Sequence, residues 1–298
     1  MRHRNVVSWL LPFALLLSVG VTAVAQSTQT DNKTATPDER GWTSYVEFDG
    51  SHNSTGSVFS LTPSVGYDFS RHFGLTAGVP IYMVRGSTST GSTDSNGLGD
   101  PYLGLLFRFP NHVVNYRSTL IGGAPLGNTG LGLSTGRFTV DWNNRFDRSF
   151  GRLTPFFDAG IGNSLRDTRF FQRPFTTLGF VSHFEGGADV DVWKFFSAGG
   201  SLYAVEPSGQ QKVFSKLVPR GQVGSNGSHG RAFGVNHVTV VADLVRDHGF
   251  STWIDASPRR VLDLELAYSR SSDFDLNTVS FTVGVNVARL LGKGAPAK

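Results

Sequence analysis

The residues best able to do chemistry in this sequence are charged side chains that alternate with apolar ones. Gathered around a common space, they would line a polar path for ions or small solutes, with a mild preference for cations because carboxylates outnumber arginines. The candidates are Asp68, Asp100, Arg108, Asp141, Arg145, Asp158, His183, Glu185, Asp189, Asp263 and Glu265, and Glu47, Asp191 and Asp255 follow the same pattern. A second interpretation stays open, in which these charges pair across strands and hold a filled interior together.

Other kinds of site find less support. Residues 225–229 read Ser-Asn-Gly-Ser-His, but no spaced base or orienting group accompanies them, and a polar loop is the simpler interpretation. Asp189 and Asp191 share a strand face and could bind a cation, although such pairs are common on wet faces. The chain has no cysteine, which excludes disulfides and thiolate metal sites. We expect no catalytic residues, no cofactor and no metal centre.

The first residues predict export. Arg2 and Arg4 precede an apolar run, and the small residues at 23–25 provide a cleavage site. Because both arginines lie in the leader, the mature chain is nearly neutral despite a sequence pI of about 9.5, so its charge does not indicate nucleic-acid binding. The expected organisation is a signal peptide over 1–25, a polar lead over 26–41, a β domain over 42–291 and a short polar tail over 292–298.

Strands must position the charged side chains, because apolar and polar residues alternate with a period of two. The alternation is most regular over 57–69, where one face carries Phe59, Leu61, Pro63, Val65, Tyr67 and Phe69. Similar segments follow one another to residue 287 as a meander. Segment 238–245 also fits one face of a helix, and an even strand number requires it to lie in a loop, leaving 249–257 as the tenth of about twelve strands.

The connections between these segments sort by length. Short turns are expected at 70–72, 110–112, 148–151, 193–194 and 257–260, and long polar loops at 85–97, 124–136, 163–176 and 206–236. Aromatic residues gather at the short turns: Phe69, Phe73, Phe107, Phe109, Phe146, Phe150, Trp193, Phe195 and Phe196. Together these patterns predict an all-β, antiparallel, up-and-down transmembrane β-barrel with short periplasmic turns and long extracellular loops. A soluble sandwich is the alternative fold.

Three short motifs carry a family resemblance. Residues 97–105 read Gly-Leu-Gly-Asp-Pro-Tyr-Leu-Gly-Leu, residues 125–127 read Pro-Leu-Gly, and residues 133–136 read Leu-Ser-Thr-Gly. They resemble the outer-membrane family labelled "MetA-pathway of phenol degradation", although Leu126 and Ser134 depart from its usual residues. The last part of the chain, 250–287, is similar to the end of such proteins. The resemblance implies a barrel and passage of hydrophobic or aromatic compounds.

The expected function is therefore a channel or transporter for small, hydrophobic or aromatic compounds in a Gram-negative-type outer membrane. Its expected partners are outer-membrane lipid and lipopolysaccharide, the barrel-assembly machinery and a small-molecule solute, with no nucleic acid. Two alternatives remain: a structural or adhesive barrel without transport, and a lipid-modifying barrel enzyme that uses Ser and His on the outer face.

Overall fold

The computed structural model describes residues 40–88, 91–164, 175–215, 237–241, 245–259 and 261–291. The expected signal peptide over 1–25, the expected tail over 292–298 and all but the end of the expected lead over 26–41 lie outside the described residues. None of the helices within the described ranges is long and apolar enough to cross a membrane.

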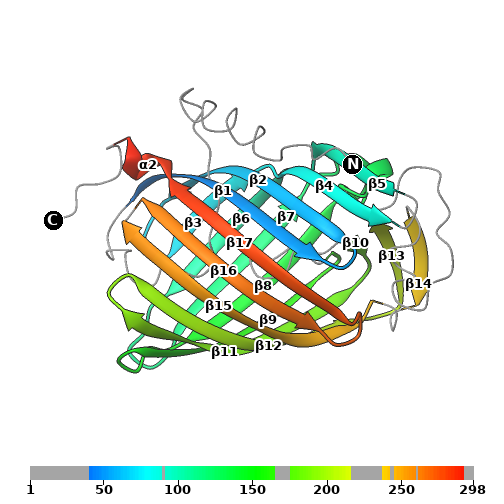
Figure 1. Cartoon of the computed structure of the whole chain (residues 1–298). Helices are drawn as coiled ribbons and strands as arrows, with labels where there is room; N and C mark the ends of the chain where they lie inside the picture. The colour runs from blue at the N-terminus through cyan, green and yellow to red at the C-terminus, as the bar shows by residue number, and fades with distance from the viewer. Residues whose placement is uncertain are drawn as a thin grey trace, which may run out of the picture.

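Strands make up most of the described chain (Figure 1). The first half contains β1 (Gly41–Asn53), β2 (Gly56–Asp68), β3 (Phe73–Gly78), β4 (Ile81–Thr88), β5 (Gly91–Leu98), β6 (Tyr102–Phe109), β7 (Asn115–Gly123), the 3-10 helix η3 (Thr129–Leu131), β8 (Thr139–Asp147) and β9 (Leu153–Gly162). The second half contains β10 (Phe175–Leu178), β11 (Val181–Trp193), β12 (Phe196–Pro207), β13 (Gln210–Ser215), β14 (His237–Val241), β15 (Asp247–Arg259), β16 (Leu262–Ser271), β17 (Leu276–Asn286) and the short helix α2 (Val287–Leu290).

These strands form a closed antiparallel barrel of 12 strands, which confirms the predicted fold class. The wall runs from β1 through β2, β3, β6, β7, β8, β9, β11, β12, β15, β16 and β17, and β17 pairs again with β1. Strand β4 extends β3, and β5 extends β6, so each of these pairs makes one strand of the wall. Closure leaves the described barrel wall without an unpaired edge, the condition for β-structure in hydrocarbon.

Two strands of the wall continue beyond prolines as a hairpin that the sequence did not predict. The strand pairing is interrupted at Pro80 between β3 and β4 and again at Pro101 between β5 and β6, since proline cannot donate a backbone hydrogen bond. Residues 85–88 and 91–97 of the expected loop over 85–97 therefore belong to the strands of the β4–β5 hairpin. Its Ser- and Thr-rich sequence is polar at both alternating positions, so no apolar period marked these strands.

The two faces of the wall differ as predicted. On β2, Val65 is 47% exposed and faces away from the barrel, whereas Ser60 and Ser64 face inward and are buried. Outward ion pairs lie towards the end of the barrel that carries the long connections: Arg85–Asp94, Glu206–Arg246 and Arg270–Asp275. The outward face between the strand ends is apolar.

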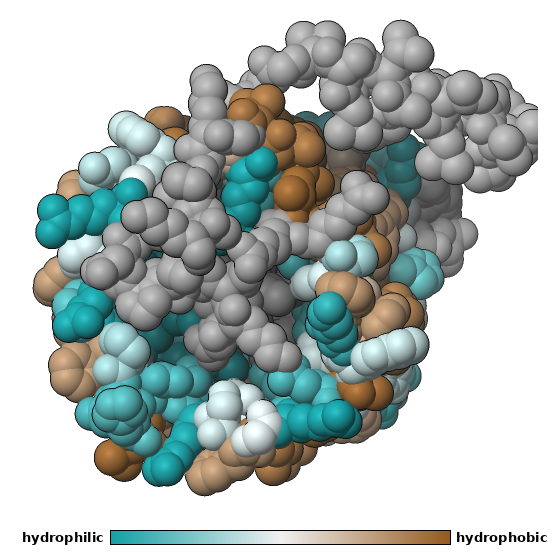
Figure 2. All heavy atoms as spheres, turned by 90° about the vertical axis from the view of Figure 1, so that its left-hand side faces the viewer, coloured by the Kyte–Doolittle hydropathy of each residue, from teal (hydrophilic) through white to brown (hydrophobic). Residues whose placement is uncertain are grey.

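The short predicted turns lie at one end of the barrel, with α2, at the left in Figure 1. Strand β15 continues to Arg259, so the last of these turns is shorter than predicted. Exposed aromatic side chains surround this end: Phe69, Phe73, Phe109, Phe146, Phe150, Trp193, Phe195 and Phe196. Neighbouring rings touch across strands, as for Phe73 and Phe107, whose centroids lie 5.1 Å apart. Figure 2 looks at this end and shows hydrophobic residues at its margin.

The opposite end carries the long connections and a second, three-stranded sheet of β10, β13 and β14. Two connections at this end, 54–55 and 272–275, are short. The described part of segment 238–245 lies outside the barrel wall, and β15 is the tenth strand of the wall, both as predicted. The helical interpretation of this segment is wrong for residues 237–241, which form β14 and pair with β13. A partner strand supplied by the preceding connection overrides the weak helical period.

Candidate functional site: the barrel interior

Strand register arranges the inward-facing charges in rows. Arg108, Arg117 and Arg145 are successive partners across β6, β7 and β8. The row continues through Asp158 on β9 and Glu185 on β11. Basic residues therefore occupy one stretch of the inner wall and acidic residues the next.

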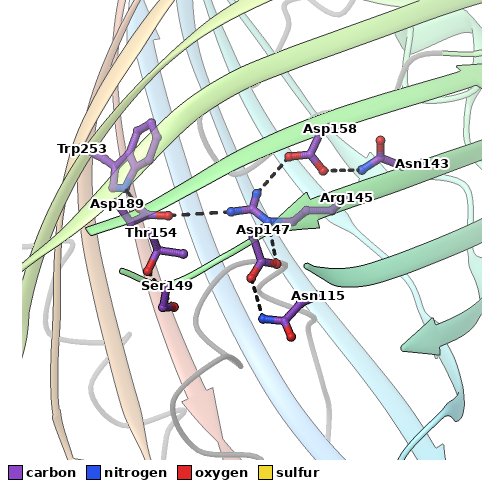
Figure 3. A network of polar contacts seen from close by, with 9 residues as sticks. All are labelled: Asn115, Asn143, Arg145, Asp147, Ser149, Thr154, Asp158, Asp189 and Trp253. Atoms are coloured by element: carbon purple, nitrogen blue, oxygen red, sulfur yellow. Dashed lines mark hydrogen bonds and ion pairs between the residues drawn. The ribbon is translucent and has the colours of Figure 1, made fainter. Parts of the chain in front are cut away.

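Arg145 is the centre of a buried ionic network, drawn in Figure 3. Its Nη1 lies 2.9 Å from Asp158 Oδ2, its Nη2 lies 3.7 Å from Asp189 Oδ2, and its Nε lies 3.9 Å from Asp147 Oδ1. The Arg145 residue is only 9% exposed. A buried guanidinium needs such partners, because removing a charge from water is costly unless other charges and hydrogen bonds replace the water.

Amide and indole groups complete the hydrogen bonding of these carboxylates. Asn143 Nδ2 donates to Asp158 at 3.0 Å, and Asn115 Nδ2 donates to Asp147 at 3.1 Å. Trp253 Nε1 donates to Asp189 at 2.9 Å. The network thus joins β7, β8, β9, β11 and β15, which together form nearly half of the wall.

Two aromatic rings extend this network along the inner wall. The Arg145 guanidinium lies 3.9 Å from the centre of the Phe156 ring, and the centroids of Phe156 and Trp253 lie 6.2 Å apart. Both aromatic residues are buried, and Trp253 is 2% exposed. Glycines make room for them, because a Cβ at Gly199 would overlap the Trp253 ring and one at Gly187 would lie 2.9 Å from Phe156.

The cluster described above is called the "inner bridge" and consists of Arg145, Asp147, Asp158, Phe156 and Trp253. The strand register places it nearer the end with the short turns. Asp147 is the last residue of β8 before one of those turns, and Phe156 lies opposite it on β9. Large side chains there take up part of the barrel's cross-section. The inner bridge can therefore do two things: brace the wall, and set the charge and width that a passing solute meets.

Most of the other predicted residues also lie on the inward face, with partners nearby. Three pairs are close: Arg108 Nη1 with Asp68 Oδ1 at 2.8 Å, His183 Nε2 with Asp141 Oδ1 at 2.9 Å, and Ser257 Oγ with Asp263 Oδ1 at 2.7 Å. Glu265 on β16 lies opposite Asp255 on β15. Asp189, considered with Asp191 as a cation site, contacts Arg145 and Trp253.

Asp100 has a different position. It lies in the break between β5 and β6, where Oδ1 accepts the N–H of Gly127 and Oδ2 accepts the hydroxyl of Ser134, both at 2.9 Å. Both partners belong to the connection between β7 and β8. Its carboxylate therefore serves the local structure of a loop at the end with the long connections.

The sequence interpretation missed several interior residues. Among them are the carboxylates of Asp49, Asp147 and Asp247, the guanidinium of Arg117 and the rings of Phe156 and Trp253. Asp49 accepts hydrogen bonds from Ser60 and Thr282, and Asp247 accepts them from Tyr203 and Ser271. For Phe156 the sequence does carry a signal: it lies two residues before Asp158, so its ring takes a position on the polar face of its strand.

Two features belong to the outer face. His52 Nδ1 lies 2.8 Å from Ser57 Oγ, a cross-strand pair on the outward side of β1 and β2. A shallow apolar pocket of about 410 Å³ is lined by residues that include Leu120, Trp142 and Phe180. Within the described ranges, no group of three His, Asp or Glu residues could hold a metal ion.

Comparison with known proteins finds similarity in structure. No family model matches the sequence, and no curated protein matches it. The crystal structure of an outer-membrane channel from Pseudomonas putida F1 superposes with a TM-score of 0.55 at 12% sequence identity, covering 86% of this chain and 98% of that one. The KdgM porin superposes with a TM-score of 0.49 at 10% identity, covering 81% and 98%. The chain therefore shares the barrel fold of a known outer-membrane channel.

Proposed function

We propose that this protein is an outer-membrane channel that passes small solutes and prefers cations to anions. One observation carries the proposal: the same closed sheet has an apolar outward face and a charged inward face. A barrel wall of this kind fits a membrane outside and a polar path inside. The export signal expected over 1–25 supports location in the outer membrane, with lipid and lipopolysaccharide around the wall.

The cation preference follows from the interior charge. On the inward face of the described wall strands, carboxylates outnumber the guanidinium groups of Arg108, Arg117 and Arg145. An excess of negative charge along a narrow path raises the local concentration of cations and lowers that of anions.

We propose that the solutes are hydrophobic or aromatic compounds, because the motifs at 97–105, 125–127 and 133–136 resemble those of the phenol-degradation family. Phe156 and Trp253 add two rings to the otherwise polar interior, but at 6% and 2% exposure they leave a passing solute little surface on which to stack.

The test is conductance of the purified protein in planar bilayers. Discrete single-channel steps, with a reversal potential that shows cation preference under a potassium chloride gradient, are expected. Adding phenol, which is uncharged at neutral pH, to one side should reduce the current if aromatic solutes enter. Absence of steps from protein that migrates as a folded barrel would contradict the proposal and favour a structural barrel braced by its inner bridge.

A lipid-modifying enzyme has one observation in its favour, the His52–Ser57 pair on the outer face. A serine nucleophile also needs a group that orients its base. No hydrogen bond from another described residue reaches the second ring nitrogen of His52, so we keep the channel as the proposed function. Release of fatty acid from phospholipid vesicles, abolished by Ser57→Ala, would reverse this choice.

A further inference from the structure

The connection between β7 and β8, residues 124–138, is the "mouth loop". It lies at the end of the barrel with the long connections, and Asp100 fastens it by accepting hydrogen bonds from Gly127 and Ser134. Ser134 Oγ in turn accepts the N–H of Gly136 at 3.0 Å. Ser134 is buried, so these hydrogen bonds meet little competition from water.

Close backbone packing also holds the mouth loop against the segment that carries Asp100. A Cβ at Gly127 would lie 2.9 Å from both the carbonyl carbon of Gly99 and the carbonyl oxygen of Leu133. There is no room for a side chain at this point. The motifs at 97–105, 125–127 and 133–136, which are separate in the sequence, therefore meet as one structural unit.

The mouth loop reaches back over the inner face of strands that precede it. Leu133 is 3% exposed and packs against Val58 on β2 and Val84 on β4. Val58 and Val84 are register partners, and Val58 shares the inward face of β2 with Ser60. A Cβ at Gly97 of β5 would lie 2.9 Å from Leu133 Cδ1. The loop thus covers the inward side of β2, β4 and β5 at this mouth.

We propose that the mouth loop is a size filter for the channel, and that Asp100 is the positioning residue that holds it in place. This inference rests on the proposed function, since a filter requires solutes that pass. Asp100 acts on the loop and not on the solute, because both of its carboxylate oxygens already accept hydrogen bonds within the protein. The buried apolar contact of Leu133 fills space at the mouth and narrows the entrance.

The first experiment compares Asp100→Ala with Asp100→Asn in planar bilayers. Alanine removes both acceptors, so the loop should detach, with higher single-channel conductance and entry of larger polyethylene glycols. Asparagine can accept from Gly127 and donate to Ser134, so it should stay near wild type. Asp94→Ala is the matched control, because it removes an exposed carboxylate of β5 that bonds Arg85. Equal conductance and polymer cut-off for Asp100→Ala and wild type would overturn the inference and leave the channel proposal intact.

A second experiment tests the position of the mouth loop by chemical labelling, which does not depend on ion conduction. The chain has no cysteine, so Leu133→Cys introduces a single thiol at the buried contact. Its reaction with a membrane-impermeant maleimide should be slow, and faster by on the order of tenfold or more when Asp100→Ala is added, because a hydrogen bond to a charged acceptor is worth about that factor. Ser134→Ala, which removes one of the two bonds, should give a smaller increase and guards against misfolding of the Asp100 variant. Unchanged labelling rates in both variants would show that Asp100 does not hold the mouth loop in place, even in a protein that does not conduct.

Discussion

The indole nitrogen of Trp253 on β15 donates a hydrogen bond to Asp189 on β11 across the strand that separates them, β12. The link is possible because Gly199 on β12 has no side chain, so the indole lies directly over its backbone. Neither residue is near the other in sequence. One small residue thus decides whether an aromatic side chain can brace three strands of the wall.

Gly199→Ala should destabilise the barrel by roughly 1–3 kcal/mol, because its Cβ would overlap the Trp253 ring. In a Trp253→Ala background the same substitution should cost much less, since the overlapping ring is gone. Urea unfolding of all four proteins of this double-mutant cycle measures the coupling. Gly200→Ala is the control, because a Cβ there makes only ordinary contacts, 3.4 Å or more from its neighbours. Equal costs of Gly199→Ala in the two backgrounds would show that the indole does not rest on this glycine.

Arg145→Gln should cost about 3–5 kcal/mol in unfolding free energy, because it leaves buried carboxylates without their cation. Arg108→Gln should cost less, since the Arg108–Asp68 pair is more exposed and water screens it. Arg145→Lys keeps the charge but loses the planar guanidinium that reaches several carboxylates. Its loss of unfolding free energy should lie between those of Arg108→Gln and Arg145→Gln. The reversal potential of Arg145→Gln should move towards stronger cation preference. A stable Arg145→Gln protein would mean that water, not Arg145, compensates these carboxylates.

Val65→Arg should cost roughly 2–4 kcal/mol near the bilayer midplane, because it places a charge on the outward face. The control is Thr62→Arg on the same strand, whose side chain faces inward opposite Glu47. That variant should fold and lower the cation preference. Folding yield into lipid vesicles and urea unfolding measure both effects. If Thr62→Arg were the more damaging of the two, the outward face of β2 would not be the one in contact with lipid.

The orientation of the barrel in the membrane determines which of its two ends an impermeant reagent can reach from outside intact cells. Leu126→Cys in the mouth loop should react with an impermeant maleimide added outside, because Leu126 is exposed and long connections face outward. His112→Cys, in a short turn at the opposite end, should react only after the cells are broken. Labelling of His112→Cys alone in intact cells would invert the topology.

The sequence by itself determined the wall of this protein. The period-two alternation of β2 and its neighbours separates an outward from an inward face. The number of such segments, with the even strand number that a bacterial barrel requires, predicts about twelve strands, and the structure has 12 with β15 as the tenth. The alternation is local, since it depends on residues within one strand. For the same reason, the pairing of short turns with aromatic residues could be read from the chain alone.

Only the tertiary structure decided which inward residues meet. Arg145 contacts carboxylates of its own strand, of β9 and of β11, and Trp253 joins them from β15, because strand order and register bring segments that are distant in the sequence together. Asp100 looked like one more lumen charge, yet a break at Pro101 turns it towards the mouth loop. The β4–β5 hairpin and β14 were missed because their strands depend on a pairing partner and not on an apolar period. Alternation fixes the face on which a side chain lies, and the register and packing of neighbouring segments fix its partner.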